Sequence, residues 1–285
     1  MKNIIFVCTG NTCRSPMAEG LFRKYLCERD LDFISVKSVG LAAAVGLPPS
    51  DNAVEAAAAL GADISAHRSR ALTQYDFSQD TYFVCMTSSH AMILRQYTEK
   101  EQILTLNVPD PYMGSLSVYK ATAEQITATF DTVFRFVFGC APPRRMCLSD
   151  VESVAEIETA CFSHPWTSAG LAEETENPTA RFFVAESDGK PIAYIGANNI
   201  AGEVYITNIA VLPSYRRKGI GELLLSALLT VSQKEQAEFV TLEVRKSNQA
   251  AIHLYEKLGF SKCGLRKGFY RDPDEDALIF THNFH

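Results

Sequence analysis

Hydrophobic residues follow a regular alternation in the first half of this chain. Short apolar runs at 4–7, 81–86 and 103–106 are separated by stretches in which apolar residues recur every three or four positions. Such runs are typical of strands buried on both faces, and the longer period is typical of amphipathic helices. Strands that alternate with helices predict a parallel sheet with helices on both faces, an α/β fold, over residues 1–140.

Three further elements complete this predicted domain. Residues 32–40 alternate into another strand, and an alanine-rich helix begins at Ser50 and is closed by Gly61. A long closing helix is expected to end at Gly139. Its buried face is expected to consist of Ile126, Phe130, Val133, Phe134 and Val137.

The segment 141–145, Ala-Pro-Pro-Arg-Arg, is a stiff polar break that predicts a short linker. A second domain over 146–285 is expected after it, as the length of 285 residues also favours. Its first helix is expected at 152–162. Strands are expected at 181–186, 191–197 and 203–212, the first two joined by a hairpin turn at Asp188-Gly189.

Composition narrows the functional classes. The net charge is -6 and neither half is basic, so a nucleic-acid partner is not expected. The sequence has no signal-peptide pattern and no apolar stretch long enough to cross a membrane. Eight irregularly spaced cysteines fit a reducing cytosol better than a disulfide scaffold, and the six histidines lack metal-ligand spacing. We therefore expect a cytoplasmic protein with no metal and no membrane partner.

Residues 8–16, CTGNTCRSP, lie between the first strand and the first helix. Gly10 and Asn11 tolerate the left-handed conformation that a tight loop needs, and Pro16 suits a first helical position. A loop of this kind turns backbone N–H groups inward at a helix N-terminus, where they bind an anion.

Cys8 and Arg14 add reactive groups to this anion site. The Arg14 guanidinium is a planar fork for two phosphate oxygens, and the positive surroundings stabilise a Cys8 thiolate. Cys8 is therefore expected to be a nucleophile toward phosphorus. The C-x5-R spacing occurs by chance in many chains, so the interpretation depends on the strand, the Gly-Asn pair and the helix around it.

Asp110 is a second candidate residue. It lies in Val-Pro-Asp-Pro-Tyr, where the flanking prolines oppose a helix and favour a loop that holds the carboxyl over a site. An ordinary Asx-turn carboxylate is the alternative.

The motif VCTGNTCRSPMAE, with Asp110-Pro111-Tyr112 further on, resembles the low-molecular-weight protein tyrosine phosphatase family over residues 1–140. The resemblance implies that Cys8 forms a phosphocysteine and that Asp110 first protonates the leaving group and later activates water. It implies no cofactor for this domain. The phosphate would lie among Arg14 and the loop residues Thr9, Gly10, Asn11, Thr12, Cys13 and Ser15.

The sequence leaves three details of this loop open. Ser15 caps the helix, hydrogen-bonds the thiolate, or does both. Cys13 is either a small packed side chain or, as in relatives, a thiol that traps an oxidised nucleophile as a disulfide. Thr12 stands where many tyrosine-specific relatives have an aliphatic residue, and CTGNTCRS resembles the bacterial protein arginine phosphatase branch. We therefore favour phosphoarginine over phosphotyrosine as the substrate group.

Arsenate reductase shares this fold and loop and is an alternative for the first domain. Its thioredoxin-linked form needs two further cysteines near one another to relay a disulfide. Cys85 is followed by MTSSHAMILR and has no such partner nearby in the sequence. The sequence therefore disfavours this alternative.

A second phosphate-binding pattern appears at 216–221, RRKGIG. Its glycines allow close backbone approach, and its basic residues precede a helix N-terminus suited to a pyrophosphate. The loop holds no nucleophile, so it predicts cofactor binding, with an exposed basic turn as the alternative. The helix after it is expected to bury Ile220, Leu223, Leu224, Ala227 and Leu228.

The second half resembles the GNAT acetyltransferase superfamily in the order of its segments. These are TNIAVLPSYRRKGIG, then LEVRKSNQAAIHLYEKLGF, then a last strand near 276–278. Within the superfamily, the likeness is to bacterial ribosomal-protein alanine N-acetyltransferases. The resemblance implies a mixed sheet, acetyl-CoA as cofactor, and a protein N-terminus, such as that of a ribosomal protein, as acetyl acceptor. The implied cofactor contacts are Ile209, Val211, Arg216, Arg217, Lys218, Gly219, Ile220, Gly221 and Asn248.

Glu243 and Tyr255 are the candidates for the transfer chemistry. In FVTLEVR, strand alternation places Glu243 on the face opposite Val240, Leu242 and Val244, toward the expected cleft. An attacking amine must lose a proton, so Glu243 suits a base, directly or through water. The resemblance places an acid for the leaving CoA thiolate at Tyr255, and a core tyrosine is the alternative.

The sequence thus predicts a bifunctional enzyme, a thiolate phosphatase fused to a protein N-acetyltransferase. A rival interpretation makes one half a module that senses a phosphorylated or acylated ligand while the other half does chemistry.

Overall fold

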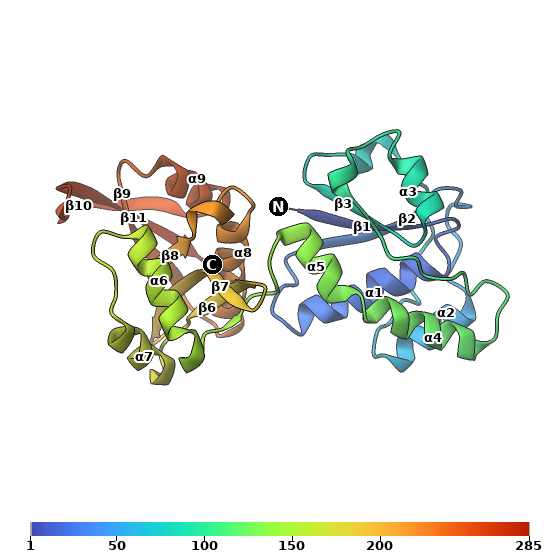
Figure 1. The fold of residues 1–285 in the computed structure, drawn as a ribbon, viewed down its shortest axis with the longest axis horizontal. Helices are drawn as coiled ribbons and strands as arrows, with labels where there is room; N and C mark the ends of the chain where they lie inside the picture. The colour runs from blue at the N-terminus through green and yellow to red at the C-terminus, as the bar shows by residue number, and fades with distance from the viewer. Residues whose placement is uncertain (1, 285) are drawn as a thin grey trace. The chain divides into compact units, whose positions relative to one another are not determined.

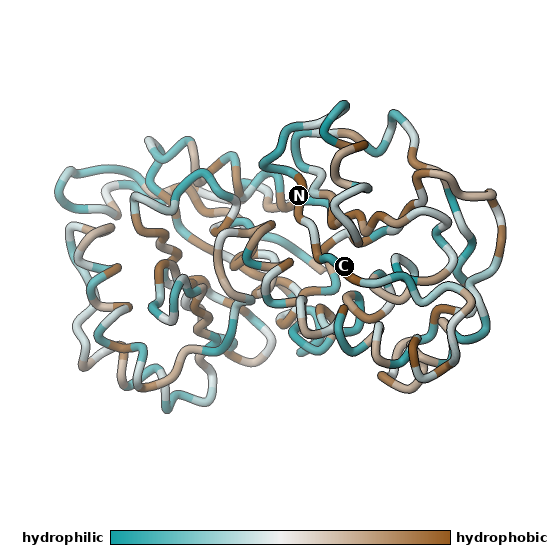
Figure 2. Tube along the Cα trace, turned by 45° about the vertical axis from the view of Figure 1, so that its right-hand side comes forward, coloured by the Kyte–Doolittle hydropathy of each residue, from teal (hydrophilic) through white to brown (hydrophobic). Residues whose placement is uncertain are grey.

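The computed structural model describes residues 2–284, and the chain divides between Val137 and Phe138 into two compact units. Each unit has its own sheet (Figure 1). Hydrophilic stretches lie mainly in the loops of each unit, and hydrophobic ones run through its strands and helices (Figure 2). Within residues 2–284, no helix has both the length and the apolar character that spanning a membrane requires.

The first unit is built on a four-stranded parallel sheet. In spatial order its strands are β2 (Ser35–Gly40), β1 (Asn3–Cys8), β3 (Thr81–Cys85) and β4 (Ile103–Thr105). Helices α1 (Arg14–Cys27), α4 (Leu116–Thr127) and α5 (Phe130–Phe138) lie on one side of the sheet, and α3 (Ser88–Leu94) lies on the other (Figure 1). Helix α2 (Asp51–Ala59) packs against α1 and α4.

The central strand β1 is buried on both faces. On one face the ring of Phe6 packs edge-on against Phe22 at 5.5 Å between centroids, and Phe22 packs against Phe130 at 4.9 Å. On the other face Ile5 and Val7 join a buried apolar cluster. This two-sided burial explains why the strand is a continuous apolar run, and the α/β fold expected for this half is confirmed.

The prediction of one long closing helix is wrong, because this segment forms two helices, α4 and α5. The Thr127 hydroxyl bonds to the Ala123 carbonyl at 2.9 Å, and the Thr129 hydroxyl bonds to the Ile126 carbonyl at 2.6 Å. Such side-chain bonds to the backbone compete with the helical ladder at the break. The five apolar residues predicted for its inner face are nonetheless all buried.

The second unit is a mixed sheet of seven strands, ordered β10-β11-β9-β8-β7-β6-β5. Its long strands are β7 (Lys190–Ile200), β8 (Glu203–Val211), β9 (Phe239–Arg245), β10 (Ser261–Tyr270) and β11 (Glu275–Asn283), with β6 (Phe183–Ser187) beside β7. All neighbours are antiparallel except β8 and β9. The helices are α6 (Val151–Cys161), α7 (Ser168–Glu176), α8 (Ile220–Lys234) and α9 (Gln249–Lys257).

Two local predictions for this unit are confirmed. Asp188 and Gly189 both have positive φ, at 51° and 78°, as a hairpin turn between β6 and β7 requires. The five residues predicted for the inner stripe of α8 are all buried. Helix α7 and strand β10 were not predicted, because α7 has a weak apolar pattern and β10 is mostly exposed.

The segment 141–145 does more than connect the units. Its last two residues form the short strand β5 (Arg144–Arg145), which pairs with β6 at the sheet edge. The Ala141 N–H also donates to the Glu186 carbonyl at 2.7 Å. These residues therefore belong to the sheet of the second unit.

Candidate active sites

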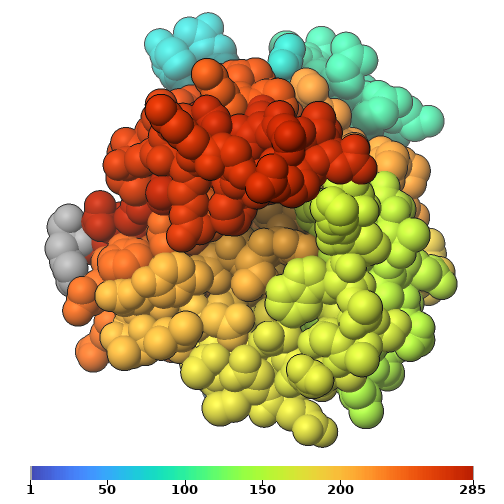
Figure 3. Space-filling model, turned by 90° about the vertical axis from the view of Figure 1, so that its left-hand side faces the viewer, coloured from blue at the N-terminus to red at the C-terminus, as the bar shows by residue number. Residues whose placement is uncertain are grey.

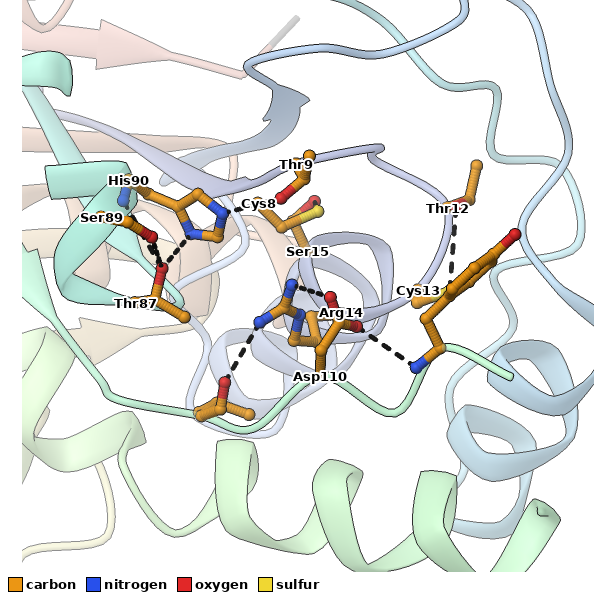
Figure 4. Close-up of polar contacts among 12 residues, drawn as sticks. Cys8, Thr9, Thr12, Cys13, Arg14, Ser15, Thr87, Ser89, His90 and Asp110 are labelled. Carbon is orange, nitrogen blue, oxygen red and sulfur yellow. Dashed lines mark hydrogen bonds and ion pairs between the residues drawn. The ribbon is translucent and has the colours of Figure 1, made fainter. Parts of the chain in front are cut away.

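The loop after β1 surrounds the Cys8 sulfur with hydrogen-bond donors. The Asn11 backbone N–H points at the sulfur from 3.2 Å, and the Ser15 hydroxyl lies 2.9 Å from it. Cys8 is almost fully buried at the end of β1, and Ser15 lies in the first turn of α1 (Figure 4). The sulfur therefore stands at a helix N-terminus, where negative charge is favoured.

Asn11 holds the loop in shape. It is fully buried in the left-handed region, with φ 56°, and its Nδ2 donates to the hydroxyls of Ser15 and Ser38 at 2.9 Å each. Its Oδ1 accepts from the Arg70 backbone N–H at 2.8 Å, and its carbonyl lies 3.1 Å from His67 Nε2. Every polar group of the side chain is thus used to fix the loop around the sulfur.

Of the two loop residues that tolerate the left-handed conformation, Asn11 adopts it and Gly10 does not. The hydrogen bonds of the Asn11 side chain offset the cost of its strained backbone. Pro16 is the third residue of α1 rather than the first. It still lies in the first turn, where a missing N–H costs no helical hydrogen bond.

Gly40 lets strand β2 pass close to the loop. A side-chain carbon at this position would lie 2.6 Å from the Thr9 carbonyl oxygen and 3.0 Å from the Asn11 nitrogen. The N–H of Leu41 also donates to the Cys8 carbonyl at 3.0 Å. The shape of the nucleophile loop therefore depends on a glycine in a neighbouring strand.

Arg14 and Asp110 form an ion pair beside the loop. Arg14 Nη2 donates to Asp110 Oδ2 at 2.5 Å, and Nη1 donates to the Val108 carbonyl at 3.2 Å (Figure 4). The arginine side chain is 5% exposed, whereas that of Asp110 is 51% exposed. The structure thus brings the carboxyl of the Pro-Asp-Pro loop to the arginine of the nucleophile loop, across 96 residues of sequence.

Cys13 faces away from the hydrogen bonds of Cys8 into a polar cluster of its own. Its sulfur lies 3.3 Å from the Tyr119 hydroxyl, 3.5 Å from the Ser50 hydroxyl and 3.7 Å from the Thr12 hydroxyl. Burial, with a contribution from Cys13, raises the pKa of Tyr119 to about 12, so Tyr119 keeps its proton at neutral pH. Cys13 is thus a small side chain packed among hydroxyl groups, and a redox role for it stays a prediction.

The second candidate site lies where β8 and β9 separate. Their parallel ladder pairs Glu203–Tyr205 with Phe239–Thr241 and extends no further among the described residues. Beyond that point β8 continues through Ile209 and Val211 with only β7 as a partner. This part of β8 therefore has no strand partner on the side away from β7, where a ligand with amide groups can bind, although the Val211 carbonyl already accepts from the Arg216 side chain.

The loop before α8 has the shape of an anion site. Arg217 and Gly219 are both left-handed, with φ of 65° and 84°, and Gly219 is the N-cap of α8. Arg217 and Lys218 are exposed, whereas the Arg216 side chain donates to the Val211 carbonyl at 2.9 Å and to Cys161 Sγ at 3.5 Å. Arg216 is exposed as well, so all three cations of the loop are accessible, with Arg216 tied back to β8 by its hydrogen bond. Ile220 is buried, and Gly221 in the first turn has ordinary contacts.

Glu243 follows the point of separation on β9. It lies on the less buried face of the strand, as its alternation predicts, and its Oε1 accepts from Arg266 Nη1 at 2.8 Å. The Tyr270 hydroxyl donates to the Glu243 carbonyl at 3.1 Å. Figure 3 shows a hollow in the second unit, between the red atoms of the β10–β11 hairpin, the gold atoms around β8 and the lime atoms of α6.

Tyr255 is buried on α9 among aromatic rings. It is 4% exposed and packs near Phe260 and Phe280, with centroids 5.8 and 6.3 Å away. Burial raises its pKa far above the ordinary tyrosine value, so it is protonated at neutral pH. Asn248 is the N-cap of α9, and its Oδ1 accepts from the Ala251 N–H at 3.2 Å.

Residues 2–284 contain no cluster of three or more side chains able to hold a metal ion. Cys85 is fully buried in the first unit, and this burial raises the pKa of its thiol to about 12. A thiol in that setting is a poor relay group, because disulfide exchange needs a thiolate.

Two family models match this chain. Residues 3–137 match low molecular weight phosphotyrosine protein phosphatase, and residues 151–260 match the acetyltransferase (GNAT) family. The chain belongs to both families, one in each half. The acetyltransferase half is similar to the putative ribosomal protein bS18-alanine N-acetyltransferase of Bacillus subtilis. That protein is 41% identical over 140 residues, which cover 49% of this chain and 93% of the relative.

The phosphatase half is similar to two solved structures. The low molecular weight protein tyrosine phosphatase from T. tengcongensis is 36% identical with a TM-score of 0.45, and the match covers 47% of this chain and 99% of that one. The YwlE arginine phosphatase from Geobacillus stearothermophilus is 34% identical with a TM-score of 0.42, covering 47% of this chain and 90% of that one.

Several residues around the phosphatase loop were not found from the sequence. Ser38, His67 and Arg70 bind Asn11, and Glu19 accepts from Ser38 at 2.7 Å. These residues are spread along the sequence, and their spacing from Cys8 matches no motif. Only the three-dimensional structure therefore reveals these supporting residues.

Proposed function

We propose that this chain is a bifunctional enzyme. Residues 1–140 would hydrolyse phosphorylated protein side chains through a phosphocysteine, and residues 146–285 would transfer acetyl groups from acetyl-CoA to protein N-terminal amines. The observation that supports the first activity is the Cys8 sulfur within hydrogen-bond distance of the Asn11 N–H and the Ser15 hydroxyl. The second is supported by the separation of β8 and β9 beside the left-handed loop of α8.

In the first step the Cys8 thiolate attacks phosphorus. An S–P bond forms, and the bond from phosphorus to the leaving nitrogen or oxygen breaks with its electron pair on the leaving atom. Asp110 donates a proton to that atom, and the Arg14 fork binds two phosphoryl oxygens. Because Arg14 pairs with Asp110 in the free chain, the incoming phosphoryl group replaces the carboxylate on the arginine. The released Asp110 takes up a proton from solvent and then donates it to the leaving atom.

In the second step water attacks the phosphocysteine. Asp110, now a carboxylate, takes a proton from the water, and the S–P bond breaks with its electron pair on sulfur. The Asn11 N–H and the Ser15 hydroxyl are positioned to stabilise the departing thiolate.

Two substitutions test this sequence of steps. Cys8→Ser should abolish turnover, and Asp110→Asn should lower it by about 10² to 10⁴ for a substrate with a poor leaving group. Unchanged turnover in the Cys8 variant would end the phosphatase proposal and favour a module that only binds phosphorylated ligands.

We favour phosphoarginine over phosphotyrosine as the substrate group. Thr12 is partly exposed in the loop, where its hydroxyl can place water or a guanidinium donor, while an aliphatic side chain would favour a phenyl ring. Hydrolysis of matched phosphoarginine and phosphotyrosine peptides tests this choice. Thr12→Ile should move the ratio of the two kcat/KM values toward phosphotyrosine by about tenfold or more. An unchanged ratio would show that Thr12 does not determine the preference between the two substrates.

The residues of the second site fit acetyl-CoA, which supplies an activated acetyl thioester. The unpaired edge of β8 through Ile209 and Val211 suits its amide groups, and the loop 216–221 suits its pyrophosphate through backbone N–H groups, Arg217 and Lys218. Asn248 at the start of α9 remains a proposed further contact. The printed name of the Bacillus relative supports an N-terminal alanine, such as that of a ribosomal protein, as the acceptor.

Glu243 is the proposed base and Tyr255 the proposed acid. Glu243 would take a proton from the acceptor amine once that amine replaces Arg266 as its partner. Tyr255 is protonated at neutral pH, as an ordinary tyrosine is, and would donate that proton to the leaving sulfur; burial raises its pKa and so makes it a weaker acid. Release of free thiol from acetyl-CoA with an alanine-ended peptide should fall by about 10² or more in Glu243→Gln and in Tyr255→Phe. No loss in either variant would refute these roles.

A further inference from the structure

A chain of hydrogen-bonding groups reaches the nucleophile loop from the start of α3. The Ser89 and Thr87 hydroxyls are 2.8 Å apart, and the Thr87 hydroxyl lies 3.0 Å from His90 Nδ1. On the other side of the ring, His90 Nε2 lies 3.0 Å from the hydroxyl of Thr9, the residue after Cys8 (Figure 4). The four side chains thus form one continuous path that ends beside the nucleophile.

His90 sits in this path as a neutral ring. It is 5% exposed, and its pKa is lowered first by burial and then by the nearby Arg14 cation, while the Asp110 carboxylate acts in the opposite direction. A neutral imidazole has one nitrogen that donates and one that accepts. One of the two neighbouring hydroxyls, those of Thr87 and Thr9, must therefore donate to the ring, and the other must accept from it.

The contacts of Thr87 are compatible with a chain directed toward Thr9. The Thr87 hydroxyl oxygen already accepts from the His90 backbone N–H at 3.5 Å as the N-cap of α3, and it can accept from Ser89 as well. Its own proton is then available for His90 Nδ1. With Nδ1 accepting, the ring proton is on Nε2 and is donated to the Thr9 oxygen, which leaves the Thr9 proton unused.

Thr9 is exposed in the loop that surrounds Cys8, so its hydroxyl is accessible to a ligand. We propose that Ser89, Thr87 and His90 form a directed hydrogen-bond chain that presents the Thr9 hydroxyl as a donor to an oxygen of the bound phosphoryl group. The inference rests on the proposed phosphatase function. It makes Thr9 a binding residue through its side chain, in addition to its backbone, and His90 a positioning residue that acts through Thr9.

A hydrogen bond to an anionic oxygen is stronger than one between neutral groups. Its loss at an exposed position is expected to cost about tenfold in kcat/KM, less than the full effect of a donor in a closed oxyanion site. Because the transition state places charge on the phosphoryl oxygens, part of this loss is expected in kcat.

The test uses the full chain with an aryl phosphate as substrate and inorganic phosphate as a competitive inhibitor. Thr9→Val removes the hydroxyl, and Thr9→Ser keeps it. His90→Asn places an amide near the Nδ1 position and loses the contact with Thr9, whereas His90→Gln places one near the Nε2 position and keeps it. We expect Thr9→Val and His90→Asn each to lower kcat/KM and phosphate affinity about tenfold, with Thr9→Ser and His90→Gln recovering most of the loss.

The double variant Thr9→Val/His90→Asn should be no worse than either single variant, since both remove the same interaction. Fully additive losses, or a Thr9→Val variant as active as the wild type, would overturn the inference while leaving the phosphatase proposal intact. Absence of hydrolysis by the wild-type chain would overturn both. If His90→Asn does not fold, the exposed Thr9 pair of variants decides the question alone.

Discussion

At the scale of single residues, the nucleophile loop depends on groups that its own sequence does not contain. Cys8, Arg14 and Ser15 lie within one short motif, and the motif alone indicates their proximity. The groups that fix Asn11 come from β2 and from the segment before β3. No spacing in the sequence encodes these contacts, because the register of the sheet and the path of a loop create them.

Gly40 provides a residue-scale prediction. Gly40→Ala would place a carbon 2.6 Å from the Thr9 carbonyl oxygen, and backbone on that side can yield only if the nucleophile loop moves. Displaced donors stabilise the transition state less well, so phosphatase kcat/KM is expected to fall by about tenfold or more. Urea unfolding of the first unit, compared with that of the wild type, serves as the folding control. Full phosphatase activity in this variant would show that the loop tolerates the shift.

His90 provides a second residue-scale prediction, which concerns pH. Burial and the Arg14 cation lower its pKa in the folded chain below the ordinary value of about 6.5. Its contribution to stability is therefore complete above that pH and is lost as the pH falls through the lower folded value. Titration of the His90 ring by NMR should give a midpoint below about 6.5, which bound phosphate should raise because negative charge favours the imidazolium. A midpoint at or above that value in the free protein would contradict the environment described.

At the scale of elements, periodicity predicted the buried strands and helices well. Strands β1, β3 and β9 and helix α8 carry clear apolar patterns and were found. Strand β10 is exposed along most of its length and pairs with β11 through its backbone, so its side chains carry no signal. The break between α4 and α5 arises at threonines whose hydroxyls bond to the backbone, and an apolar stripe does not report such bonds.

Glu158 on α6 allows a prediction at this scale. It is fully buried, and its carboxylate accepts hydrogen bonds from the Tyr194 hydroxyl, from Asn208 Nδ2 at 2.7 Å and from the Trp166 N–H at 2.8 Å. Glu158→Ala leaves these donors unpaired in the core and should lower the free energy of unfolding of the second unit by about 2 to 3 kcal/mol or more, since each unsatisfied buried donor costs about 1 to 3 kcal/mol. Glu158→Gln keeps an acceptor and should cost less. Urea unfolding measures both, and a cost below about 1 kcal/mol for the alanine variant would contradict the packing described.

At the scale of the whole molecule, the sequence indicated two domains, because each half carries its own pattern and its own reactive set. The detail at the boundary was not predictable, since Arg144 and Arg145 have no strand pattern and pair with β6 only in the fold. Arg144 donates to both oxygens of Asp150, at 2.7 and 2.8 Å, and also binds Glu186.

This anchoring of the boundary segment gives a prediction for the stability of the second unit. The Arg144 guanidinium lowers the pKa of Asp150 to about 2, so the pair contributes stability at pH above the ordinary aspartate value of about 3.9, and that stability is lost as the pH falls through 2. Arg144→Met should lower the free energy of unfolding by about 1.5 to 3 kcal/mol at neutral pH, with a smaller effect in acid. Thermal unfolding at both pH values checks it. An equal effect at both would assign the loss to packing rather than to charge.

The central claim is that phosphate passes through the sulfur of Cys8, and capture of that intermediate tests it most directly. Asp110→Asn should still accept the phosphoryl group from an aryl phosphate with a good leaving group. It should hydrolyse the resulting phosphocysteine slowly, because the attacking water no longer has a carboxylate to take its proton. Acid quenching followed by mass spectrometry of the peptide with Cys8 is predicted to show one added phosphoryl group, absent in Asp110→Asn combined with Cys8→Ala, because alanine offers no nucleophile. Hydrolysis by the wild-type chain with no adduct on Cys8, together with turnover by Cys8→Ser, would contradict the account.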